Sequence, residues 1–138
     1  MIGAIVAKRK ARSAFDALNR RDIQAFLRDW SDEATFTYPG TLSVSGIFEG
    51  KAAVDDWFHR FMDRFPEISF TVNNVCVRSI FALGGTNVLM AQWDIALTNG
   101  DGKEFKNSGV TVITVKKGKV VEVRDYIFDM AQAQEAWA

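Results

Sequence analysis

The sequence of 138 residues predicts an α+β fold, in which three helices of the N-terminal half pack on a curled, mainly antiparallel sheet shaped like a cone or α+β barrel. Apolar residues recur at helical spacing in three segments before Pro66, and from Ile68 onward they follow a period of two. The inward parity of the first long strand changes at Asn73-Asn74, which predicts a β-bulge that bends the sheet. No linker or repeat divides the chain, so we expect residues 1–138 to form one domain.

Two helices are predicted before residue 32. The first ends near Asn19, since its apolar residues recur at three- and four-residue steps: Ala7, Ala11, Ala14, Phe15 and Leu18. Asp22 is expected to cap a second helix, because its carboxylate can accept the free backbone N–H groups of a first turn. The apolar spacing of this second helix extends to Trp30 and predicts its end at Ser31-Asp32.

A short strand and a third helix follow. The strand is predicted because Ala34, Phe36 and Tyr38 alternate with threonines until Pro39-Gly40 ends the run. Residues 41–49 contain few long apolar side chains and predict a loop or a brief hairpin arm. The third helix runs from Lys51 to Phe65 with one apolar stripe, and Pro66 terminates it.

The second half of the chain predicts four long strands in a meander. Hairpin turns are indicated by Gly84-Gly85, by residues 99–102 and by Lys117-Gly118. Trp93 is expected inside the sheet, with Asp94 on the opposite face. Both faces of the later strands carry apolar residues, so we expect a homodimer that forms through the sheet.

Composition argues against several classes of partner and cofactor. The 17 basic side chains equal the 17 acidic ones, which disfavours binding to nucleic acid. No segment resembles a membrane span or a signal peptide, so we expect no membrane association and a cytoplasmic location. Cys76 is expected to be buried and His59 to lie on a polar helix face. Neither belongs to a cluster with metal-ligand spacing, and the glycine turns precede no helix that could bind phosphate, so we predict no metal and no cofactor.

Several local patterns carry a resemblance to a known family over nearly the whole chain. They are, in order, the helix from Asp22 to Trp30, Phe36-Thr37-Tyr38-Pro39-Gly40, Phe48-Glu49-Gly50-Lys51, Trp93, Gly109 to Val112, and Lys117 to Tyr126. In this order they resemble the nuclear transport factor 2-like superfamily, in particular its SnoaL-like and ketosteroid-isomerase-like branches. The resemblance implies a cone that hosts isomerases, polyketide cyclases, epoxide hydrolases, dehydratases and non-catalytic binding domains, among which the fold alone does not choose.

The same resemblance implies where proton transfer would occur. Ketosteroid-isomerase-like members carry an aspartate just before Pro-Gly, where this sequence has Tyr38; a neutral phenol is a poor base but a good donor to a developing oxyanion. SnoaL-like cyclases use an aspartate near the end of the last strand, and the segment from Arg124 offers Asp125 and Asp129. Alternation places Asp125 on the face of Val123 without saying which face is inside, so both aspartates stay candidates.

We therefore take Asp125, Asp129 and Tyr38 as candidate catalytic residues in a hydrophobic pocket that binds a small apolar or aromatic ligand. The residues expected to line this pocket are Phe36, Trp57, Phe61, Trp93, Asn107 and Tyr126. The resemblance implies a small-molecule enzyme, namely an isomerase, cyclase or dehydratase that works by acid–base catalysis. The alternative is a non-catalytic ligand-binding or assembly module with the same fold, which the missing aspartate at Tyr38 favours.

Overall fold

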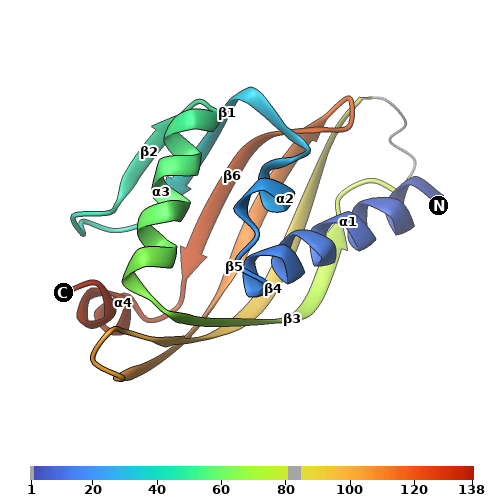
Figure 1. Cartoon of the computed structure of the whole chain (residues 1–138). Coiled ribbons are helices and arrows are strands. Elements are labelled where there is room, and N and C mark those ends of the chain that lie inside the picture. The colour runs from blue at the N-terminus through green and yellow to red at the C-terminus, as the bar shows by residue number, and fades with distance from the viewer. Residues whose placement is uncertain (1, 81–84) are drawn as a thin grey trace.

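The structure is a computed structural model that describes residues 2–80 and 85–138 (Figure 1). Its elements are α1 (Ile2–Asn19), α2 (Ile23–Leu27), β1 (Trp30–Tyr38), β2 (Gly46–Glu49), α3 (Lys51–Arg64), β3 (Glu67–Val77), β4 (Thr86–Thr98), β5 (Glu104–Lys116), β6 (Lys119–Ile127) and α4 (Met130–Trp137). The predicted α+β class is confirmed, with helices packed on a mainly antiparallel sheet.

The described strands form one sheet in the order β2-β1-β6-β5-β4-β3. Strands β3 to β6 form the predicted meander, and β1 joins β6 in the only parallel pairing among them. The edges of the sheet are β2 and β3, so the sheet curls without closing into a barrel. The helices α1, α2 and α3 lie across one face, which we call the inner face (Figure 1).

The predicted bulge lies in β3, where the register against β4 shifts between Val72 and Asn74. Ile68 before the bulge and Val75 after it are both buried although they differ in parity, because the extra residue restores the inward direction. Strand β3 bends along its length and carries α1 on its inner side (Figure 1). The bulge therefore gives the sheet the curvature that leaves a hollow under the helices.

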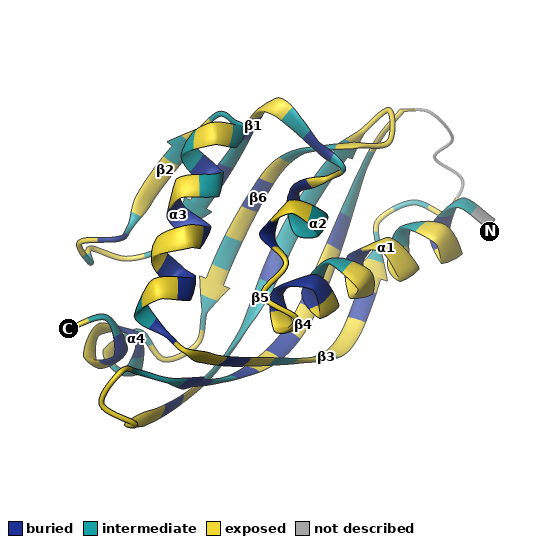
Figure 2. Cartoon of the chain, viewed as in Figure 1, coloured by how far each residue is buried: buried dark blue, intermediate teal, exposed yellow. Residues whose placement is uncertain are grey.

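The core lies between the helices and the inner face of the sheet. Helix α3 directs its apolar stripe inward and its charged side outward, as the burial colours in Figure 2 show. Phe36 of β1 is 1% exposed and contacts the rings of Trp57 and Phe58 at centroid distances of 4.8 and 5.1 Å. Aromatic rings are too rigid to fill every gap of a curved interior, so such a core readily retains a cavity.

The end of one helix and the presence of another differ from the sequence prediction. Helix α2 ends at Leu27, and Trp30 begins β1 with its side chain buried. Trp30 is seven residues after Ile23, so this buried strand residue fits the i, i+7 spacing of a helix by coincidence. Helix α4 has no counterpart in the prediction; Asp129 caps it by accepting the Gln132 N–H at 3.0 Å.

Most of the predicted turns and surface positions agree with the structure. Residues 99–102 and Lys117-Gly118 connect strands as predicted, while Gly84 lies outside the described residues. His59 is exposed on α3 as expected. Cys76 is exposed, so the prediction that it is buried is wrong: the bulge turns Val75 inward and its neighbour outward.

Within residues 2–80 and 85–138, no helix combines the length and the apolar character that a membrane crossing requires. The cytoplasmic location stays a prediction.

Candidate functional site

A cavity of about 560 Å³ lies between the helices and the inner face of the sheet. Its size is within the range of small-molecule binding sites. Its walls include four residues that the sequence predicted for the pocket, namely Phe36, Trp57, Phe61 and Trp93. These aromatic walls can exclude water from a ligand and provide flat surfaces for planar groups.

On the sheet side of the cavity, hydrogen bonds connect the side chains of Trp93, Thr111 and Asp125. The Trp93 indole N–H donates to Thr111 Oγ1 at 2.8 Å, and this hydroxyl donates to Asp125 Oδ1 at 2.7 Å. An indole can only donate, so the threonine must accept from Trp93 and direct its own hydrogen to the carboxylate. Asp125 Oδ2 forms no hydrogen bond with the described residues, and the residue lines the cavity, so this oxygen is open to a ligand.

The surroundings of Asp125 change its acidity. Burial disfavours the charged form and raises the pKa of Asp125 from 3.8 to about 7, although the Thr111 hydrogen bond acts in the opposite direction. No basic side chain is hydrogen-bonded or ion-paired to Asp125 among the described residues. Near neutral pH the carboxyl group therefore exists in both protonation states and can accept or release a proton.

Tyr38 lines the same cavity as Asp125. Burial raises the pKa of Tyr38 above its ordinary value, and the negative charge of Asp125 contributes in the same direction. The phenol is therefore neutral at physiological pH. Its oxygen accepts a hydrogen bond from the Trp137 indole N–H at 3.0 Å, which leaves the hydroxyl hydrogen available for a ligand oxygen.

The Trp93 ring occupies space that is free only because Gly109 has no side chain. These residues are opposite one another in β4 and β5, and a Cβ on Gly109 would lie 2.8 Å from the Trp93 ring. The indole thus lies over the glycine and reaches the next inward residue of β5, Thr111. The sequence patterns identified neither Thr111 nor Trp137 as a site residue. One signal could have identified Thr111: it is a polar residue at a position of β5 that alternation directs toward the interior.

Two predicted site residues have their polar groups engaged in the chain itself. Asp129 does not line the cavity: it is exposed, and its carboxylate caps α4, so the expectation that it lies in the pocket is wrong. Asn107 lines the cavity as predicted. Its amide, however, donates to the Asp129 carbonyl at 2.7 Å and accepts the Asp129 N–H at 3.0 Å. Asn107 therefore holds the junction between β6 and α4.

Tyr126 lies on the face of the sheet opposite the helices, which we call the outer face. Its side chain is 50% exposed and packs under the Arg124 guanidinium at 5.7 Å. Alternation along β6 sends Val123 and Asp125 inward and sends their neighbours outward. The expectation that Tyr126 lines the pocket is therefore wrong.

Among the described residues, no three side chains of His, Cys, Asp or Glu are grouped so that they could hold a metal ion. The cavity lining includes the Asp125 carboxyl, the Tyr38 hydroxyl and the Thr111 hydroxyl, together with charged side chains of α1 and of the segment after α2.

A curled sheet, covering helices and an aromatic cavity that contains the Asp125 carboxyl group define a cone-shaped α+β domain. Residues 11–123 match the family of SnoaL-like domains, and the chain belongs to this family. No curated protein matches the sequence.

Solved structures share the fold across nearly the whole chain. Bal32a, from a soil-derived mobile gene cassette, is similar with a TM-score of 0.79 at 20% identity, covering 95% of both chains. A Bacillus subtilis protein provisionally described as an isomerase has a TM-score of 0.78 at 25% identity, covering 94% of this chain and 91% of its own. TerC, co-crystallised with polyporic acid, has a TM-score of 0.72 at 16% identity, covering 93% of this chain and 95% of its own.

Proposed function

We propose that this protein is an enzyme that moves a proton on a small, apolar, carbonyl-bearing substrate, as an isomerase, cyclase or dehydratase does. Asp125 is the acid–base group and Tyr38 the hydrogen-bond donor to the carbonyl oxygen. The observation that carries the proposal is a carboxyl group with a pKa of about 7 at the floor of an aromatic cavity. The Bacillus subtilis protein provisionally described as an isomerase and TerC, which was co-crystallised with the small molecule polyporic acid, are consistent with a small-molecule substrate.

The reaction follows from the two groups. Ionised Asp125 accepts a proton from the carbon beside the carbonyl; the electron pair of the broken C–H bond forms a carbon–carbon double bond, and the π pair of the carbonyl moves onto its oxygen. The neutral Tyr38 hydroxyl donates to that oxygen as its negative charge develops. The Trp137 N–H at the phenol oxygen polarises the O–H bond and strengthens this donation. Return of the proton to another carbon gives an isomer, whereas attack of the enolate on a second carbonyl gives a ring.

Thr111 holds the carboxyl group for this task. Its hydroxyl occupies Oδ1, so the transferred proton resides on Oδ2, the oxygen that is open to the cavity. Trp93 in turn occupies the Thr111 oxygen and fixes the direction of the threonine hydroxyl. We assign Thr111 and Trp93 as positioning residues of the proposed site.

Hydrogen exchange tests the proposal without knowledge of the product. Aromatic β-diketones are incubated with the protein in D₂O, and the loss of the hydrogen between the carbonyls is followed by NMR. We expect wild-type protein to accelerate exchange and Asp125→Asn to reduce that acceleration by about a hundredfold or more. Asp129→Asn, which changes a carboxylate outside the cavity, is expected to retain the wild-type rate. Equal rates for wild type and Asp125→Asn would contradict the proposal and favour the non-catalytic binding module.

A homodimer through the outer face of the sheet is part of the same proposal. This face carries the large apolar side chains of Met90 and Tyr126, which are 49% and 50% exposed, and Phe128, 88% exposed, directly follows β6. Half-buried valines 110 and 112 lie on the same side of β5. A contiguous apolar surface of this kind is typical of a self-association site. Light scattering of wild type and Tyr126→Asp tests it: we expect twice the monomer mass for wild type and a lower mass for the variant.

A further inference from the structure

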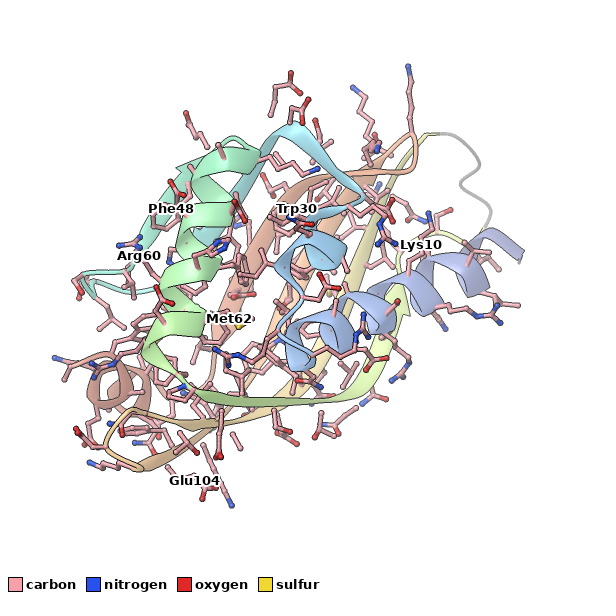
Figure 3. The ribbon with its side chains drawn as sticks, in the orientation of Figure 1. Lys10, Trp30, Phe48, Arg60, Met62 and Glu104 are labelled. Carbon is pink, nitrogen blue, oxygen red and sulfur yellow. The ribbon has the colours of Figure 1, made fainter. Side chains whose placement is uncertain are left out.

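The cavity extends well beyond the Asp125 carboxyl group. Lys10, Arg28 and Asp29 also line it, and the Lys10 and Asp29 side chains are 58% and 48% exposed to solvent. A cavity lined by solvent-exposed side chains opens to solvent at that point, and we call this opening the α1–α2 mouth. Figure 3 labels Lys10 on α1 beside this mouth, and Trp30 at the start of β1, which directly follows Asp29.

The distance between the mouth and the Asp125 carboxyl group follows from the strand register. The Val120 N–H donates to the Asp29 carbonyl at 2.8 Å, which places Asp29 beside the Val115–Val120 pair. Thr111, which faces Asp125, lies four residues further along β5. At about 3.3 Å per residue, the mouth and the carboxyl group are about 13 Å apart along the sheet.

The wall between the mouth and Asp125 is apolar. The sheet supplies Leu89, Ile113 and Val123, and α1 supplies the small side chains Ala7, Ala11 and Ala14 as well as the larger Phe15 and Leu18. An apolar wall of this kind suits a hydrocarbon segment.

The mouth is cationic, although the whole chain has no net charge. The lining residues of α1, α2 and their flanks include the cations Lys10, Arg20 and Arg28 and the carboxylates Asp22 and Asp29, an excess of one positive charge. Asp22 is engaged as the cap of α2. Lys10 Nζ lies 3.8 Å from Asp29 Oδ2, and the Arg28 guanidinium has no ion pair among the described residues. The Lys10 ammonium group thus already pairs with the Asp29 carboxylate, and at this distance a ligand carboxylate can compete for it.

We propose that the natural substrate is an elongated amphiphile whose carboxylate binds Lys10 and Arg28 at the α1–α2 mouth and whose apolar chain runs along the cavity to Asp125. This inference rests on the proposed function in taking the cavity as the substrate site. It adds the class of substrate: a carboxylic acid with its reactive carbonyl about 13 Å from the carboxylate.

Calorimetric titration with decanoate and decan-1-ol tests the proposal, since these probes share the chain and differ in charge. We expect Lys10→Met to weaken decanoate binding about fivefold and to leave decanol binding within about twofold. Asp29→Asn removes the competing carboxylate, so we expect it to strengthen decanoate binding without changing decanol binding. Lys8→Met is the matched control, because Lys8 is exposed on α1 and does not line the cavity; it is expected to change neither affinity.

Three results would overturn the inference. They are an equal effect of Lys10→Met on both probes, an effect of Lys8→Met as large as that of Lys10→Met, and failure of decanoate to bind wild type. None of them bears on proton transfer at Asp125, because the diketone exchange assay measures that step with a compound that carries no carboxylate. Loss of exchange with intact decanoate binding would instead contradict the proposed function alone.

Discussion

Replacement of Asp125 by asparagine is expected to stabilise the protein at alkaline pH. Burial raises the pKa of Asp125 to about 7 from 3.8, so the folded state binds the proton more tightly than the unfolded state does. The free energy of unfolding of wild type should therefore fall as the pH rises from about 4 to about 7, and change no further above that pH. Asparagine is neutral at every pH, has nearly the same volume and still accepts the Thr111 hydrogen bond.

The size of the effect follows from the shift. About three pKa units at about 1.4 kcal/mol each give a gain of at most about 4 kcal/mol for Asp125→Asn at pH 8. Water that enters the cavity lowers this value. Below pH 4 the carboxyl group is neutral in both states, so the two proteins should be equally stable within about 1 kcal/mol. At pH 8 the gain corresponds to a rise in melting temperature of about 10 °C.

Urea denaturation of both proteins between pH 4 and pH 9 measures the difference. Glu122→Gln is the control, because it removes an exposed carboxylate from the same strand and should show no such pH-dependent gain. The reasoning is refuted if Asp125→Asn is no more stable than wild type at pH 8, or if its gain is as large at pH 4 as at pH 8.

Three further substitutions probe the neighbours of the carboxyl group. Thr111→Val removes the hydrogen bond that lowers the pKa of Asp125, so the carboxyl ¹³C resonance should titrate at higher pH than in wild type. Gly109→Ala places a Cβ against the Tyr126 carbonyl oxygen and the Trp93 ring and should destabilise the fold by about 1–3 kcal/mol in thermal melts, with a change in Trp fluorescence. Asp129→Ala should cost about 1 kcal/mol through loss of the α4 cap, measured by denaturation, while diketone exchange at Asp125 persists.

Local patterns predicted most of the fold. Helical spacing located α1 and α3 within a few residues, and the parity change at Asn73-Asn74 located the bulge that bends β3. The spacing of apolar residues misled where one residue fits both a helix and a strand. Trp30 satisfies the spacing of α2 and also begins β1, and only its packing against the core separates these alternatives. Helix α4 is short, and its buried alanines 133 and 136 give a weak apolar pattern.

The candidate site was predictable in its walls and ambiguous in its chemistry. Trp93 follows from strand parity, and the aromatic stripe of α3 from helical periodicity. Trp137 could not be predicted as the partner of Tyr38, because the two residues are 99 positions apart and meet only when α4 folds back over the cavity. Asn107 bears the polar group that a pocket residue needs, yet its amide is taken up by the backbone of Asp129.

The sequence by itself determined an aromatic, helix-covered curled sheet with two aspartates near the end of its last strand. Only the tertiary structure decided between them. The Lys117-Gly118 turn pairs Lys116 with Lys119, and if this register continued unchanged, Thr111 would face Arg124. The register instead shifts by one residue between Thr114 and Val115, so Thr111 faces Asp125. One extra residue in a strand exchanges its two faces, and here it turns a carboxyl group into the cavity in place of a guanidinium.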